Sequence, residues 1–172
     1  MLIAVDGYNF IKQSLELRKL EQIDLEKARE GLVEKLAQYK RMKGHSITVV
    51  FDGWQEGRLA GHRERSRGIE VVFSRQGEKA DEVLRRLAED KREGILLVTS
   101  DLGISRFAEK KGAKVIAASD FGEKMEMARF YDLKGGLEED RFPDRPVAPE
   151  KKGPSRRLTK NQRKALAAAK KL

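Results

Sequence analysis

The feature that most limits the fold of this chain is the alternation of short, β-rich apolar runs with longer segments of helical periodicity. The runs that predict strands cover residues 2–5, 47–51, 70–73, 95–99 and 114–117. Apolar runs of this length, separated by helix-length segments, indicate β-α-β units around a buried parallel sheet. The sequence therefore predicts an α/β fold with a central, mostly parallel sheet of about five strands flanked by helices.

Helices are predicted where apolar residues recur at helical spacing, over residues 8–20, 25–42, 78–90, 102–111 and 121–133. The second of these has Asp24 as a cap and Gly44 at its end. The fourth and fifth have Ser100 or Asp101, and Ser119 or Asp120, as alternative caps. Residues 53–68 are rich in Gly and Arg and lack apolar periodicity, so they are predicted to form a mobile loop.

The charge is unevenly distributed along the 172 residues. Lys and Arg number 37 against 28 Asp and Glu, and residues 151–172 hold nine basic side chains and no acidic one. A neutral body with a cationic tail is typical of proteins that bind polyanions, and nucleic acid is the first candidate. All four prolines lie between Pro143 and Pro154. We therefore predict a domain over residues 1–134, an extended Pro/Gly linker over 135–155 and a basic helical tail over 156–172.

Several classes of protein are excluded by composition. The chain has no cysteine, hence no disulfide framework, thiolate nucleophile or Cys-ligated metal. No apolar run approaches the ~20 residues of a membrane span, and the N-terminus lacks the order of a signal peptide. We expect a soluble, cytoplasmic protein without a membrane partner, and a monomer.

Aspartates follow four of the predicted strands, namely Asp6, Asp52, Asp101 and Asp120. In an open parallel sheet the carboxyl ends of the strands share one edge, where ligands bind, so these side chains are expected to converge there. Asp81, at the start of the most amphipathic helix, is placed to join them. Clustered carboxylates repel one another unless a cation compensates, and hard ions such as Mg²⁺ prefer oxygen ligands. The cluster therefore predicts a metal site.

Each aspartate also has a purely structural explanation. Asp-Gly after a strand is a common turn, and Ser-Asp before a helix is a common cap. Asn, Ser or Thr would serve in such turns and caps equally well, yet all four positions hold Asp. The joint pattern favours the metal site, while turns and caps remain the alternative for any one position.

Four motifs carry a family resemblance: VDGYNFI at residues 5–11, VFDG at 50–53, EKADEVL at 78–84 and VTSDLGI at 98–104. With them, most of residues 1–134 resembles the NYN domain ribonucleases of the PIN-like superfamily, and especially the bacterial YacP-like branch, in which a basic C-terminal extension is also typical. The resemblance implies a three-layer PIN-like fold and endonucleolytic cleavage of RNA with Mg²⁺ or Mn²⁺. It also implies mRNA on the translating ribosome as the target.

The same resemblance implies roles for individual residues. Asp6, Asp81 and Asp101 would be the core metal ligands, and Asn9 would orient a ligand or the scissile phosphate. Asp52 and Asp120 would be outer members of the site, and whether one metal or two bind is left open. Hydrolysis by a metal-activated water needs no histidine, and neither His45 nor His62 has a carboxylate neighbour pattern suggesting an acid–base pair.

Other α/β phosphate enzymes fit less well. The Asp-x-Asp motif of haloacid dehalogenase-type phosphatases is broken by Tyr8, the acidic pair of response-regulator receivers is missing from the first strand, and no glycine-rich nucleotide loop follows that strand. The remaining alternative from another class is a non-catalytic RNA- or ribosome-binding module whose aspartates are turns and caps.

RNA-binding candidates occur in two segments. In the 53–68 loop, Trp54 offers a stacking surface and arginines offer phosphate contacts, although a solvated surface loop explains the segment equally well. In the tail, cations unopposed by anions attract phosphate without sequence preference. The candidate residues are Trp54, Arg58, Arg63, Arg65 and Arg67 in the loop, and Lys151, Lys152, Arg156, Arg157, Lys160, Arg163 and Lys164 in the tail.

Overall fold

The central element of the protein is a six-stranded sheet in the order β3-β4-β2-β1-β5-β6. The computed structural model describes residues 1–53 and 61–141, with side chains up to residue 134. All neighbouring strands pair in parallel except β3 and β4, which are antiparallel. The predicted α/β fold is thus confirmed. The strands are β1 (Leu2–Asp6), β2 (Ser46–Phe51), β3 (His62–Ser66), β4 (Ile69–Phe73), β5 (Ile95–Val98) and β6 (Lys114–Ile116).

The helices of the described residues follow the predicted order with one additional break. The segment predicted as one helix over 8–20 is two, because Ser14 adopts an extended backbone and its hydroxyl accepts a hydrogen bond from the backbone N–H of Leu17. Asp24 and Gly44 cap the third helix as predicted. The helices are α1 (Gly7–Gln13), α2 (Leu15–Ile23), α3 (Leu25–Lys43), α4 (Ala80–Lys91), α5 (Leu102–Lys110) and α6 (Ala118–Arg141), with a 3-10 turn at Arg92–Gly94.

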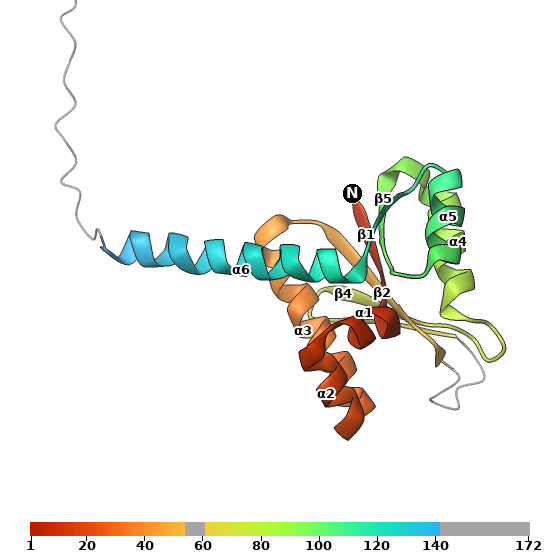
Figure 1. Cartoon of the computed structure of the whole chain (residues 1–172), viewed down its shortest axis with the longest axis horizontal. Coiled ribbons are helices and arrows are strands. Elements are labelled where there is room, and N and C mark those ends of the chain that lie inside the picture. The colour runs from red at the N-terminus through yellow and green to blue at the C-terminus, as the bar shows by residue number, and fades with distance from the viewer. Residues whose placement is uncertain (54–60, 142–172) are drawn as a thin grey trace, which may run out of the picture. The chain divides into compact units, whose positions relative to one another are not determined.

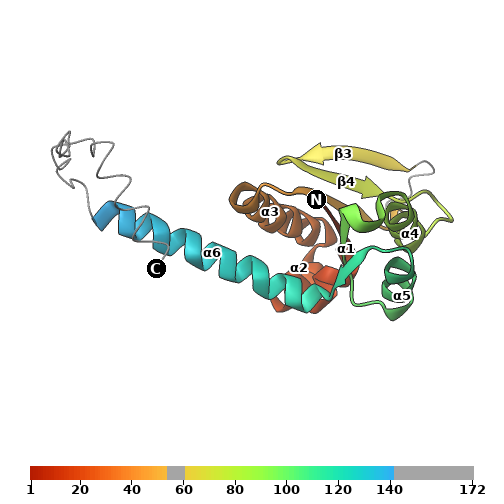
Figure 2. The same ribbon diagram turned by 90° about the horizontal axis from the view of Figure 1, so that it is seen from above.

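The helices cover both faces of the sheet and so complete three layers. On one face, α1, α3 and the first turns of α6 bury Phe51, Leu36 and Phe121 in the larger core. On the other face, α4 and α5 lie side by side (Figures 1 and 2) and bury Val50, Leu84 and Ile104. Because side chains alternate along a strand, Asp6 and Thr99 lie on the same face as Ala4 and Leu97, which is the face of α4 and α5.

The prediction of a loop over 53–68 is wrong for residues 62–66. These residues form β3, an edge strand that pairs with β4 across a tight turn at Arg67 and Gly68, both with positive φ (Figure 2). The strand carries mostly exposed charged side chains because it has no sheet neighbour beyond it, so it lacks the apolar pattern that reveals a buried strand. Residues 54–60 lie outside the described part of the chain.

The last helix is longer than predicted at both ends. It begins at Ala118 rather than near residue 121, and it continues through Gly135 and Gly136 to Arg141, where composition predicts an extended linker. A glycine in a helix costs only about 1 kcal/mol relative to alanine, which good helix formers around it offset. Residues 1–135 form one compact unit and residues 136–172 a second. The predicted tail helix lies outside the described residues.

Candidate active site

Asp6 is the buried carboxylate at the end of β1, with 8% of the residue exposed. Its Oδ1 accepts a hydrogen bond from the backbone N–H of Asn9 at 3.3 Å and so caps α1. Its Oδ2 accepts from the Thr99 hydroxyl at 3.0 Å. At the next residue, Gly7, a Cβ atom would overlap the ring of Phe51, so only glycine lets the chain turn this closely. The carboxylate of Asp6 is therefore held on one oxygen by the first turn of α1 and on the other by the residue after β5.

The electrostatic environment of Asp6 disfavours its charge. Burial raises the pKa of Asp6 from 3.8 to about 6, against the lowering effect of the hydrogen bonds from Asn9 and Thr99. Repulsion from the carboxylates of Asp81 and Asp52 raises it further. The tertiary structure thus brings three of the predicted ligands close enough to interact, and their shared charge makes the site suited to a cation.

Asp52 anchors the helix that carries Asp81. Its Oδ1 accepts a hydrogen bond of 2.6 Å from the backbone N–H of Ala80, the first residue of α4. This cap comes from outside the helix, since Lys79 at the N-cap position makes no side-chain cap hydrogen bond. Asp52 thereby positions Asp81, one residue further along, next to the end of β2. Asp52 therefore has a structural role as the side chain that caps α4.

Asp101 and Asn9 belong to a second set of contacts at the same edge. Asp101 caps α5 by accepting from the backbone N–H of Ile104 at 2.9 Å, and its side chain lies at the surface. Its own N–H donates to the Thr99 hydroxyl at 3.1 Å, and the N–H of Ser100 donates to Oδ1 of Asn9 at 2.9 Å. Thr99 thus bridges the carboxylate of Asp6 and the backbone of Asp101, while Asn9 fixes the loop between them.

Asp120 lies apart from this network. Strand β6 ends at Ile116, so Asp120 does not follow the strand directly but falls in the first turn of α6. It is exposed, and its Oδ1 accepts a hydrogen bond from the Ser119 hydroxyl at 3.2 Å. The first residue of α6 is capped instead from the segment after β5, where the Ser100 hydroxyl accepts from the N–H of Ala118.

The carboxylates fit a water-rich cation site better than a compact cage. Within residues 1–53 and 61–134, no three acidic or histidine side chains stand close enough together to coordinate one ion. Magnesium ions, however, typically keep several waters and take only one or two protein carboxylates, with substrate phosphates completing the shell. Asp6 is a buried carboxylate whose ionisation is disfavoured by the like charges of Asp52 and Asp81. A hydrated cation held by one or two of these carboxylates would relieve that repulsion.

The candidate RNA contacts are only partly within the described residues. Arg63 pairs with Glu70 at 3.2 Å, Arg67 pairs with Glu34, and Arg65 is exposed on the same edge strand. Two of the three cations are therefore partly neutralised. The other candidates lie outside the described residues: Trp54, Arg58, Lys151, Lys152, Arg156, Arg157, Lys160, Arg163 and Lys164.

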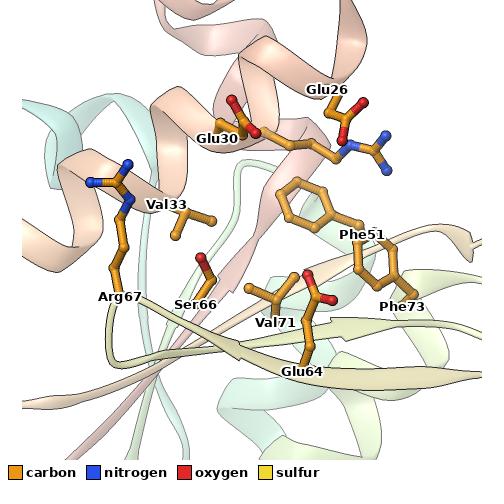
Figure 3. A pocket seen from close by; sticks show the side chains of 10 residues that line it. Glu26, Glu30, Val33, Phe51, Glu64, Ser66, Arg67, Val71 and Phe73 are labelled. Carbon is orange, nitrogen blue, oxygen red and sulfur yellow. The ribbon is translucent and has the colours of Figure 1, made fainter.

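A separate hollow of about 340 Å³ lies between α3 and the β3–β4 hairpin (Figure 3). Phe51, Phe73 and Val71 supply apolar side chains, and acidic and basic side chains of both elements surround them. None of the proposed metal ligands lines it, since it is on the α3 side of the sheet. The hollow is therefore separate from the carboxylates at the strand ends.

None of the described helices is both long enough and apolar enough to cross a membrane.

One residue near the carboxylates was missed from the sequence: Arg85, which follows Asp81 by one helical turn. The signal that would have found it is the spacing of four on a helix whose first turn carries a predicted ligand.

Comparison with known proteins agrees with the geometry. Residues 3–171 match the model of the YacP-like NYN domain. The uncharacterized protein YacP of Bacillus subtilis (strain 168) is 35% identical over 88 residues, which are 51% of this chain and 51% of that protein. The match thus spans about half the length of this curated relative.

Two crystal structures of Rae1 (YacP) from Bacillus subtilis are also similar. One, of a mutant, superimposes with a TM-score of 0.71 at 26% identity, covering 83% of this chain and 85% of Rae1. The other gives a TM-score of 0.65 at 26% identity, covering 82% and 83%. Because the family match covers nearly the whole sequence and the fold agrees with it, this chain belongs to the YacP-like NYN domain family, a nuclease family with an RNA-related function.

Proposed function

We propose that the protein is a divalent-metal-dependent endoribonuclease. The observation that carries the proposal is the state of Asp6, a buried carboxylate whose pKa is raised to about 6 by burial and by the neighbouring Asp81 and Asp52. At neutral pH this buried group is mostly ionised without a counter-charge, so a bound cation would stabilise it, and Mg²⁺ or Mn²⁺ suits its oxygen chemistry. Asp6 and Asp81 would hold the cation, with Asp101 and Asp52 acting through water.

When bound, such a cation lowers the pKa of a coordinated water and neutralises charge on the phosphate under attack. The residues of the chain prepare this chemistry. Thr99 and the N–H of Asn9 orient the two oxygens of Asp6, and Asp52 holds the turn that presents Asp81. Because Oδ1 of Asn9 already accepts from Ser100, its amide nitrogen is the group that would donate to a phosphate oxygen.

The proposed substrate is RNA, and specifically mRNA in the context of the translating ribosome. The nine cations of residues 151–172, with no anion among them, support a polyanionic partner. In this proposal the tail provides affinity for RNA with little sequence specificity, and the carboxylates at the strand ends catalyse the cleavage. We further propose that the protein acts as a monomer in the cytoplasm.

A second candidate is a non-catalytic RNA- or ribosome-binding module. It is favoured by the hydrogen bonds of the aspartates themselves, since Asp6, Asp101 and Asp52 each accept from the N-terminus of a helix. Caps of this kind would be retained whether or not a metal binds. The two candidates differ in whether removing charge at these positions abolishes a reaction or leaves binding unchanged.

The deciding experiment incubates the protein with total RNA and translating ribosomes, with Mg²⁺, with Mn²⁺ or with chelator, and maps new 5′ ends. Cleavage is expected only with metal, with 5′-phosphate and 3′-hydroxyl products, because a water and not the RNA 2′-hydroxyl attacks phosphorus. Products ending in 2′,3′-cyclic phosphate would refute this mechanism.

Substitutions identify the ligands. Asp6→Asn, Asp81→Asn and Asp101→Asn are each expected to abolish cleavage, whereas Asp90→Asn, at the exposed far end of α4, is the matched control. Asp120→Asn reports whether the outer position at the start of α6 contributes. Metal-independent cleavage, or wild-type rates in all three ligand variants, would support a different site. Retained RNA binding with no cleavage by the wild type would support the binding module.

A further inference from the structure

Arg85 lies between the two helices that carry Asp81 and Asp101. It follows Asp81 by four residues on α4, and long helical side chains lean toward the N-terminus of their helix. Its guanidinium carbon is 5.2 Å from the ring centroid of Phe107 on α5. One of its terminal nitrogens, Nη2, is 3.8 Å from the position that a Cβ atom would take at Gly103, and Oδ1 of Asp101 is 3.1 Å from that same position. The cation is therefore at the edge of the carboxylate site.

The guanidinium of Arg85 lacks the partners that other arginines of the domain have. Its Nε is buried and has no hydrogen-bond partner among the described residues. By contrast Arg86, the next residue, pairs with Glu78 at 2.5 Å, and Arg63 pairs with Glu70. A buried N–H group without an acceptor costs free energy, and such a group is usually satisfied by a ligand, a water or an ion.

The position suits a phosphate group. The cation–π contact with Phe107 holds the guanidinium in place, and the fork of N–H donors on an arginine can bind two oxygens of one phosphate. An RNA backbone approaching Asp6, Asp81 and Asp101 meets carboxylates that repel it, and a fixed cation beside them offsets that repulsion.

We propose that Arg85 binds a phosphate of the RNA next to the carboxylate edge, as a substrate-contacting residue of the nuclease site. This inference rests on the proposed function, because the phosphate is that of the RNA to be cut. In this proposal one face of α4 carries both the carboxylate of Asp81 and, one turn later, the phosphate-binding side chain of Arg85.

The first test is kinetic, with Arg85→Gln, Arg85→Lys and the matched control Arg86→Gln on a short RNA. Arg85→Gln is expected to lower kcat/KM roughly 100-fold, the usual loss for one fixed donor to a reacting phosphate or oxyanion. Arg85→Lys is expected to recover part of that loss, because it keeps the charge but not the planar fork. Arg86→Gln is expected to retain wild-type kinetics, since its side chain is exposed and paired with Glu78.

The second test separates this inference from the proposed function by measuring binding without cleavage. In an Asp81→Asn background with chelator, RNA affinity is measured against salt for the added Arg85→Gln or Arg86→Gln substitution. Loss of one phosphate contact is expected to reduce the slope of log K against log salt by about 0.7 for Arg85→Gln alone.

A shallower slope supports the phosphate contact even if the wild type cuts no RNA. Unchanged affinity and slope for Arg85→Gln overturn the contact even if its activity falls, because a purely structural role would lower activity without removing a charge contact. If Arg85→Gln does not fold, kcat/KM is measured for Arg85→Lys, which keeps a positive charge beside Phe107, and wild-type kcat/KM in that variant overturns the need for a guanidinium fork.

Discussion

Replacing Asp6 by asparagine is expected to stabilise the protein above pH 6 in metal-free buffer. In the folded protein the pKa of Asp6 is about 6, whereas its ordinary value is 3.8. Between these two pH values the folded state holds a proton that the unfolded state has lost. The free energy of unfolding of the wild type therefore falls as pH rises through this window and stays reduced above it.

The magnitude follows from the size of the shift. A difference of about two pKa units, at about 1.36 kcal/mol per unit, amounts to about 3 kcal/mol of stability lost through the buried charge. Asp6→Asn removes that charge but also exchanges one acceptor oxygen for an amide nitrogen, so one of the hydrogen bonds from Asn9 and Thr99 is weakened by about 1 kcal/mol. A net gain of about 2 kcal/mol is expected at pH 7.5.

The assay is urea unfolding of both proteins at pH 4, 5, 6 and 7.5 with chelator present. The stability of the variant relative to wild type is expected to fall by about 2.5 kcal/mol from pH 7.5 to pH 4, from a gain of about 2 kcal/mol to a loss of about 0.5 kcal/mol. Asp120→Asn, an exposed carboxylate in a first helical turn, is the control and is expected to stay within about 0.5 kcal/mol of wild type. A gap that does not change with pH would refute the reasoning, because the stability difference would then not come from the charge on Asp6. Millimolar Mg²⁺ is expected to stabilise the wild type but not Asp6→Asn.

The remaining predictions concern other parts of the chain. Deleting residues 151–172 should weaken RNA or ribosome binding and flatten its salt dependence, while turnover of a short RNA at saturation stays nearly unchanged; loss of that turnover would show that the tail belongs to the active site. Gly7→Ala should lower the free energy of unfolding by about 2–3 kcal/mol, because its Cβ would overlap the Phe51 ring. Gly94→Ala, whose Cβ would meet no atom within 4 Å, should be nearly neutral, and thermal melts of the two variants check both expectations. Asp52→Ala should destabilise the protein by about 1–2 kcal/mol through loss of the external cap of α4, and equal stability of Asp52→Ala and wild type would mean that water replaces that cap.

The sequence alone was sufficient for the elements whose signals are local. Apolar strands such as β1 and β2 are buried on both faces and so appear as apolar runs, and Asp24 and Gly44 mark the ends of α3 by the backbone conformations they favour. The placement of aspartates after strands also follows from sequence, because the carboxyl ends of parallel strands must share an edge. Asp6, Asp52 and Asp81 do interact there.

Tertiary structure decided what depends on partners distant in the chain. Strand β3 exists because β4 supplies its hydrogen bonds, which no periodicity within HRERS reveals. The raised pKa of Asp6 arises from burial beneath neighbouring elements, and the hydrogen bonds of Thr99 and Asn9 join residues about ninety positions apart. Asp120 and Asp101 occur in similar sequence contexts, yet only Asp101 shares the Thr99 network, because β5 lies beside β1 whereas β6 is at the edge. Distance between side chains in the folded chain is set by strand order, and strand order is not encoded in any short motif.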